Sequence, residues 1–217
     1  MLFTVNSNRF SRSFTFIDVH PEFAKYLPQT IYSCDYIESI PSTNTTIILP
    51  NWTCNEVNYT TFDFSRFANL EHLEIGSNSF GFVETFVIDG LKNLTTLKIG
   101  YCSFTESKYA EDNRIYKSFH VKNCDFLESI EIEDDSFSDY AGEFELVNLP
   151  SLRTISIGSY YVFSYNFYHS SFVVRGITDI FCYNNLDLPS LESIMLGLDV
   201  FHESLNTIIE GFHITLL

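Results

Sequence analysis

Basic residues are scarce in this chain of 217 residues: 12 Lys and Arg stand against 28 Asp and Glu, for a formal net charge of −16. A nucleic-acid-binding face needs clustered basic side chains to neutralise phosphates, so this balance argues against that function. It argues equally against docking on an anionic membrane surface. We interpret the acidity chiefly as a source of solubility.

Long apolar runs are also missing. No stretch approaches the roughly 20 apolar residues of a membrane-spanning helix, and the first 14 residues lack the apolar core of a secretory signal. The five cysteines are odd in number and irregularly spaced, which favours free, buried thiols in a reducing compartment. We therefore predict a cytoplasmic protein, or an extracellular one if the chain is a fragment. Without a signal, we interpret four N-glycosylation sequons as chance: Asn44, Asn51, Asn58 and Asn93.

Motifs of catalysis and metal binding are likewise lacking. The six His residues are scattered, and neither a Gly-rich phosphate loop nor a zinc spacing occurs among them. The acidic run from Glu131 to Asp135 lacks the glycine-turn spacing of a calcium loop. No His lies at a motif spacing from a Cys that could act as a nucleophile. We predict no metal, no cofactor and no enzymatic activity.

What the chain does contain is a repeat. An L-x-x-L-x-I pattern begins at Leu70, Leu94, Leu127, Leu152 and Leu191. Five residues beyond each copy comes a Phe, one residue later in the fourth copy: Phe80, Phe104, Phe137, Phe163 and Phe201. Eight residues before the first Leu of every copy but the fifth comes another: Phe62, Phe86, Phe119 and Phe144.

Fixed spacing inside the unit and variable spacing between units are typical of a solenoid, in which insertions leave through loops. No coil can bury its own apolar side, so the coils must stack. The alternation of Leu97 and Ile99 predicts a short strand with both side chains inward. We therefore predict a right-handed, β-rich solenoid of stacked coils, with a parallel sheet of short strands, an aromatic spine and little helix.

The pattern resembles the leucine-rich repeat family, whose unit is L-x-x-L-x-L-x-x-N/C-x-L. The copies from Leu70 to Phe80 and from Leu94 to Phe104 fit it, with Asn78 and Cys102 at the Asn/Cys position. The recurring I-G-x-x-S-F is similar to the irregular, Phe-rich repeats of the surface-protein type found in bacteria and protists. The resemblance implies a protein-docking role for the concave sheet.

We predict two regions from these patterns. Residues 1–36 form an N-terminal cap, and residues 37–217 form the leucine-rich repeat array. The array holds five clear coils within 62–201, a degenerate coil before them and a truncated one after.

Trp52 is expected in the core or cap, and the charged insertion from Thr105 to Lys117 is expected to be an exposed loop.

The binding candidates are the side chains of each strand that alternate with the inward ones. On the concave face they are His72, Glu74, Thr96, Lys98, Ser129, Glu131, Thr154, Ser156 and Met195. Glu74, Lys98 and Glu131 alternate in charge, which fits either cross-strand stabilisation or recognition of a partner. A second candidate is the aromatic loop with Tyr160, Tyr161, Tyr165 and Tyr168, unless these rings pack inward.

We predict a non-enzymatic protein-binding scaffold whose partner is a protein, and which is a monomer or part of a longer chain. The alternative is a structural or surface-display module without a dedicated partner. A carbohydrate-active β-helix is third, because such enzymes need paired carboxylates on one face, whereas Lys98 separates Glu74 from Glu131.

Overall fold

The computed structural model describes residues 33–106, 116–159, 163–175, 193–202 and 207–209. Twelve strands form two six-stranded sheets, and all neighbouring strands are parallel. One sheet, the odd-strand sheet, contains β1 (Thr46–Leu49), β3 (His72–Ile75), β5 (Thr96–Ile99), β7 (Ser129–Ile132), β9 (Thr154–Ile157) and β11 (Ser193–Leu196). The even-strand sheet contains β2 (Thr61–Asp63), β4 (Thr85–Asp89), β6 (Ser118–Lys122), β8 (Glu143–Val147), β10 (Ser171–Arg175) and β12 (Thr207–Ile209).

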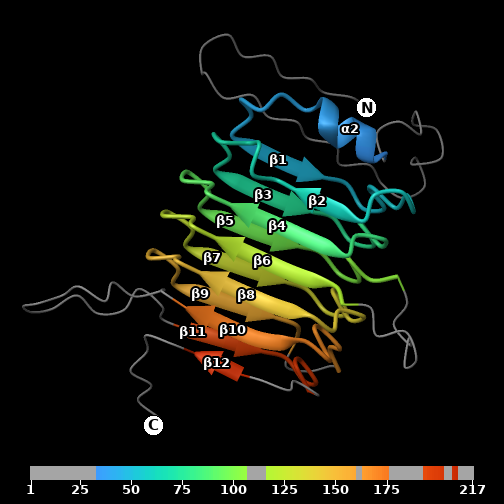
Figure 1. Ribbon diagram of the computed structural model, residues 1–217, viewed down its shortest axis with the longest axis vertical. Helices are drawn as coiled ribbons and strands as arrows, with labels where there is room; N and C mark the ends of the chain where they lie inside the picture. Colours follow the sequence, from blue (N-terminus) through green and yellow to red (C-terminus); the bar gives the residue numbers. More distant parts are fainter. Residues whose placement is uncertain (1–32, 107–115, 160–162, 176–192, 203–206, 210–217) are drawn as a thin grey trace, which may run out of the picture.

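The chain alternates between the two sheets, so each coil contributes one strand to each of them (Figure 1). The result is a β-rich, solenoid-like repeat with very little helix, which confirms the coarse prediction. The prediction of a single sheet was incomplete, because the segments carrying Phe86, Phe119 and Phe144 form a second one. Within the described ranges, no helix is long and apolar enough to cross a membrane.

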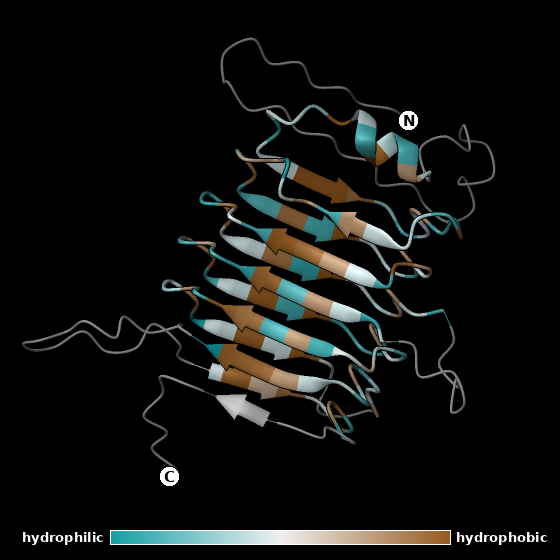
Figure 2. Cartoon of the chain, in the orientation of Figure 1, coloured by the Kyte–Doolittle hydropathy of each residue, from teal (hydrophilic) through white to brown (hydrophobic). Residues whose placement is uncertain are grey.

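The core lies between the sheets, where alternate residues of strands β1 to β9 are buried; in β11 the residues predicted to face inward, Ile194 and Leu196, are each 37% exposed. Leu97 and Ile99 of β5 are at most 1% exposed, as the alternation predicted. The neighbouring coils place Leu73 and Ile75 directly beside them. Figure 2 shows this alternation as changes of colour along the strands.

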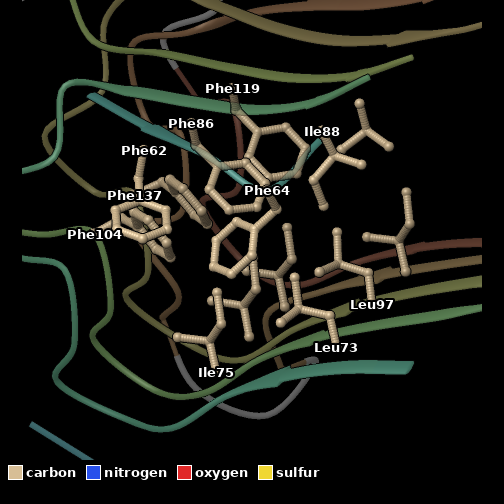
Figure 3. Packing of buried hydrophobic residues seen from close by; sticks show 14 of the residues in the cluster. Phe62, Phe64, Leu73, Ile75, Phe86, Ile88, Leu97, Phe104, Phe119 and Phe137 are labelled. Atoms are coloured by element: carbon tan, nitrogen blue, oxygen red, sulfur yellow. The ribbon is translucent and has the colours of Figure 1, made fainter. Parts of the chain in front are cut away.

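Two columns of Phe rings fill much of the core (Figure 3). In the corner column the rings stack at 4.6–5.3 Å: Phe80, Phe104, Phe137, Phe167 and Phe201. The even-strand column contains Phe62, Phe86, Phe119, Phe144 and Phe172, and its last four rings stack at 4.9–5.4 Å. Rings of different columns meet edge to face, as Phe119 and Phe137 do at 5.1 Å, an arrangement that the ring quadrupole favours.

The corner that follows β9 differs from the predicted pattern. Phe167 takes the corner position, whereas Phe163 is 64% exposed. The insertion in this coil allows the chain to bring a later Phe into the stack. Phe172 likewise continues the even-strand column, which the eight-residue rule did not find because the long segment before Leu191 separates the two residues.

Buried serines connect successive coils at the corners after β3, β5 and β7. Ser79 N–H donates to Ser103 Oγ (3.2 Å), and Ser103 N–H donates to Ser136 Oγ (3.0 Å). The hydroxyls of Ser103 and Ser136 in turn donate to the carbonyls of Gly76 and Gly100. These serines follow the Asn/Cys position of the repeat by one residue and satisfy buried backbone groups of neighbouring coils.

Helix α2 (Cys34–Ser39) packs beside the first coil. Cys34 and Ile37 are fully buried, and Arg66 donates to the carbonyls of Ile37 (2.6 Å) and Ile40 (3.3 Å) at the end of the helix. Cys34 forms a disulfide with Cys54, in contrast to the free thiols predicted for both residues. Cys124 is a free, buried thiol, and Cys102 is only partly buried.

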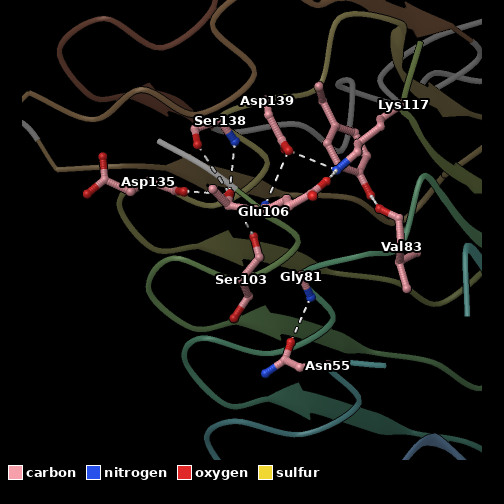
Figure 4. Close-up of polar contacts among 11 residues, drawn as sticks. Asn55, Gly81, Val83, Ser103, Glu106, Lys117, Asp135, Ser138 and Asp139 are labelled. Atoms are coloured by element: carbon pink, nitrogen blue, oxygen red, sulfur yellow. Dashed lines mark hydrogen bonds and ion pairs between the residues drawn. The ribbon is translucent and has the colours of Figure 1, made fainter. Parts of the chain in front are cut away.

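The insertion after the second full coil ends in a buried contact. Lys117 is 1% exposed, and its ammonium lies 2.8 Å from the Asp139 carboxylate (Figure 4). The prediction of an exposed loop was therefore wrong at Lys117. The neighbouring Tyr140 is also fully buried and donates its hydroxyl to Val83 O (2.6 Å). Residues 107–115 lie outside the described part.

Candidate binding site on the odd-strand sheet

The outer face of the odd-strand sheet carries all of the side chains predicted for a binding face. Its outward positions are occupied by His72, Glu74, Thr96, Lys98, Ser129, Glu131, Thr154, Ser156 and Met195. Strand pairing aligns Glu74 with Lys98 and Lys98 with Glu131. The register thus places the three charged side chains in one column across three coils.

The charges in this column are partly paired with one another. Lys98 Nζ lies 2.9 Å from Glu131 Oε2, and His72 Nε2 lies 3.6 Å from Glu74 Oε2. The hydrogen bond to Glu131 raises the pKa of Lys98, so the ammonium stays charged. Both partners of the Lys98–Glu131 pair are about half exposed, so the pair contributes no more than about 1 kcal/mol to stability.

A shallow hollow of about 130 Å³ opens where β3, β5 and β7 end. Its polar lining comes from Asn51, Glu74, Ser77, Lys98, Glu131 and Glu133. The Glu133 carboxylate accepts the Tyr101 N–H at 2.9 Å, which holds this side chain at the corner. Three carboxylates and one ammonium give the hollow a formal charge of 1 − 3 = −2.

Two glycines also line the hollow, because no larger residue fits at these corners. A Cβ on Gly76 would come within 2.5 Å of Asn51 N, and one on Gly100 within 2.7 Å of Ser77 N. Each coil therefore approaches the preceding one closely at this point. After β7 the equivalent position is Glu133. Its side chain adds a carboxylate where Gly76 and Gly100 have no side chain.

Two aromatic residues near the hollow were missed from the sequence. Trp52, predicted in the core or cap, is 62% exposed and directly follows the lining residue Asn51. Tyr101 is 40% exposed and directly follows the lining residue Gly100. Both residues come just after a strand, outside the alternating pattern. This position is the sequence feature that could have predicted their exposure. Exposed Trp and Tyr are enriched in protein interfaces.

The aromatic loop is divided by the structure. Tyr165 is 38% exposed and lies 5.8 Å from the ring of Tyr168, which stacks on His202. Phe167, between them in sequence, is fully buried. Tyr160 and Tyr161 lie outside the described residues. The described part of this loop therefore offers a smaller aromatic surface than the sequence indicated.

The opposite face of the molecule holds a different charged cluster. Across the part of the chain that is described, His120, Glu143 and Glu145 form the group of three potential metal ligands with atoms within 4.8 Å of one another. Glu145 is already bonded to His120 Nδ1 (2.9 Å) and Lys122 Nζ (2.5 Å). The pKa of Glu145 is lowered overall: burial raises it, but the bonds from Lys122 and His120 outweigh that effect. This cluster is an ion-pair network in which Lys122 supplies the positive charge.

The polar and charged lining of the hollow could contact charged and polar groups on the surface of another protein. Its carboxylates Glu74 and Glu131 flank Lys98, whose ammonium is bonded to Glu131. No family model, curated protein or solved structure matches this chain.

Proposed function

We propose that this protein is a non-enzymatic protein-binding scaffold of irregular leucine-rich repeats, and that it binds its partner on the outer face of the odd-strand sheet. The observation that carries the proposal is the charged hollow, two of whose lining residues, Asn51 and Gly100, are directly followed in the chain by the exposed Trp52 and Tyr101. Such a combination is typical of binding hot spots. The resemblance to leucine-rich repeats adds that this family uses its strand face for docking.

The charge of the hollow indicates the chemistry of the partner. A formal charge of −2, within a chain of −16, favours a basic protein surface. Opposite charge steers the encounter and disfavours acidic partners. Lys98 adds a fixed positive group between carboxylates, so the partner is expected to place an acidic or neutral group opposite it.

Affinity capture with charge-reversed variants tests the proposal. The face variant carries Glu74→Lys, Lys98→Glu and Glu131→Lys, which preserves the alternation of charge along the column. The control carries Lys122→Glu, Glu143→Lys and Glu145→Lys on the opposite face, with the same net charge change of +2. Both are compared with the unaltered chain as bait in native lysate, after circular dichroism has shown that each variant folds.

The proposal is supported if one protein is captured by the unaltered chain and the control but lost by the face variant. Equal capture by all three baits would contradict the site and favour the loop with Tyr165 and Tyr168. Capture of nothing specific by the unaltered chain would favour the structural or surface-display alternative.

A further inference from the structure

The four N-glycosylation sequons occupy very different environments in the folded chain. Asn58 and Asn93 are exposed in the connections that precede β2 and β5. Asn44 is 3% exposed. Asn51 lines the hollow, and its Oδ1 accepts the Ser77 N–H at 2.8 Å. A glycan is bulky and needs a surface position, so burial closes Asn44, whereas Asn51, Asn58 and Asn93 are all exposed.

A second, independent observation concerns the compartment in which the chain folds. Cys34 and Cys54 are both at most 1% exposed and joined by a disulfide, four residues before Asn58. Structural disulfides form in secretory and extracellular compartments and are rare in the cytosol. The compartment that favours this bond is also the one in which sequons are modified.

We propose that Asn58 and Asn93 carry N-linked glycans and that the protein matures in an oxidising, secretory compartment. In the reaction, the side-chain amide nitrogen forms a bond to C1 of the sugar of a lipid-linked oligosaccharide. The bond between C1 and the pyrophosphate oxygen of that donor breaks, and the amide nitrogen releases one proton. No oxidation or reduction takes place.

The contacts of Asn93 are compatible with modification. Its Nδ2 donates to Ala68 O at 3.3 Å, and a glycosylated amide keeps one N–H, so this bond can persist. Both Asn58 and Asn93 lie in connections between strands, away from the outward positions of either sheet. Glycans at these two positions therefore leave the outer face of the odd-strand sheet accessible. Attachment precedes folding, so a glycan at the buried Asn44 would prevent the first coil from packing.

Peptide mapping of the protein isolated from its own cells tests the proposal. Release of N-glycans by peptide N-glycosidase in ¹⁸O-water converts each modified Asn to ¹⁸O-labelled Asp. We expect labelling at Asn58 and Asn93 and none at the buried Asn44. A non-reducing map of the same sample is expected to contain the peptide pair linked through Cys34 and Cys54.

Variants of the whole chain, directed to the secretory pathway of a eukaryotic host by an added signal, provide the second measurement. Asn58→Gln and Asn93→Gln are each expected to remove one glycan-dependent step in gel mobility, and the double variant both. Asn44→Gln is the matched control and is expected to leave the mobility of the folded, secreted protein unchanged, because a chain with a glycan at Asn44 cannot pack its first coil. An unlabelled Asn58 and Asn93 in the native protein, or a labelled Asn44, would overturn the proposal.

Discussion

The corners after β3, β5, β7 and β11 each place a Phe in a backbone conformation that bulky residues rarely adopt. Phe80, Phe104, Phe137 and Phe201 have φ between 54° and 58°, in the left-handed region. Such a conformation costs on the order of 1–3 kcal/mol. Burial of each ring returns roughly 1.5–3 kcal/mol, and stacking against the next coil adds to this. The strain is thus sustained by contacts between coils.

Removal of one ring from the corner column tests this balance. Phe137 is fully buried and stacks at 4.6 Å on both Phe104 and Phe167. We expect Phe137→Ala to lower the free energy of unfolding by about 3–5 kcal/mol, measured by urea denaturation. Phe126→Ala, at a position 59% exposed, is the control and should change it by less than about 0.5 kcal/mol. A loss below about 1 kcal/mol at Phe137 would contradict its place in the core.

The buried serines give a second prediction for a single residue. Ser103 Oγ accepts the Ser79 N–H and donates to Gly76 O. Ser103→Ala leaves both backbone groups without this partner, and we expect a loss of about 1–3 kcal/mol in the free energy of unfolding. Ser156→Ala, on the outer face of β9, serves as the control. Equal stability of the two variants would mean that water replaces the hydroxyl of Ser103.

Between elements, the buried ion pair joins the start of β6 to the corner that follows β7. Lys117 Nζ contacts Asp139 Oδ2, which also accepts the Glu106 N–H at 3.2 Å. Asp139 Oδ1 is buried without a hydrogen-bond partner. Burial raises the pKa of Asp139, and this effect outweighs the attraction of Lys117. Each of the two buried charges therefore depends on the other for compensation, because neither is in contact with bulk water.

Loss of one partner is expected to destabilise the protein more than loss of both. Lys117→Met leaves the Asp139 carboxylate buried without its cation, and we expect a loss of about 3–5 kcal/mol in the free energy of unfolding near neutral pH. Adding Asp139→Asn removes the unpaired charge and should recover most of that loss. The two variants are compared by urea denaturation, and additive effects would rule out coupling between the residues.

The raised pKa of Asp139 also predicts a dependence of stability on pH. The folded protein binds a proton at Asp139 more readily than the unfolded chain does, so this group favours folding more as the pH falls. Its contribution is complete below the ordinary value of 3.8 and is lost as the pH rises through the raised pKa. The stability of the unaltered protein minus that of Asp139→Asn should therefore increase on acidification. A flat or opposite difference in urea denaturation would contradict the direction.

At the scale of the whole molecule, each strand pairs only with its neighbours in its own sheet, and the two described ends differ. The first coil is covered by α2 and linked to it by the Cys34–Cys54 disulfide. In the last described strand of the odd-strand sheet, β11, Ile194, Met195 and Leu196 are 37–48% exposed. Stability in such an array is approximately a sum of coil and interface contributions, so perturbation of one end should remain local.

Reduction of the disulfide tests this locality. The bond closes a loop with a sequence separation of 20 residues, and loops of this size contribute about 3 kcal/mol through the entropy of the unfolded chain. We expect reduction to speed hydrogen exchange in α2 and β1, while the amides of β7 and β9 keep their protection. Faster exchange throughout the molecule would show instead that the coils unfold as one cooperative unit.

Much of the candidate site could be predicted from sequence, because the period of two in a strand is a local property. Alternation alone placed Glu74, Lys98 and Glu131 on one outer face. The recurring I-G-x-x-S-F now has a physical reason at three of its positions. Gly76 permits the close approach of coils, Ser79 accepts a backbone N–H from the preceding coil, and Phe80 enters the corner column.

The sequence by itself determined which residues of β3, β5, β7 and β9 face inward, where these coils begin and how charge alternates across them, since each depends on spacing within one repeat. Only the tertiary structure decided that a second sheet encloses the core, that Phe167 replaces Phe163 in the stack, and that Cys34 meets Cys54. It also decided where the hollow opens beside Trp52. These features arise from contacts between residues of different coils. Because insertions of variable length separate the coils, a fixed repeat period does not predict which of these residues meet.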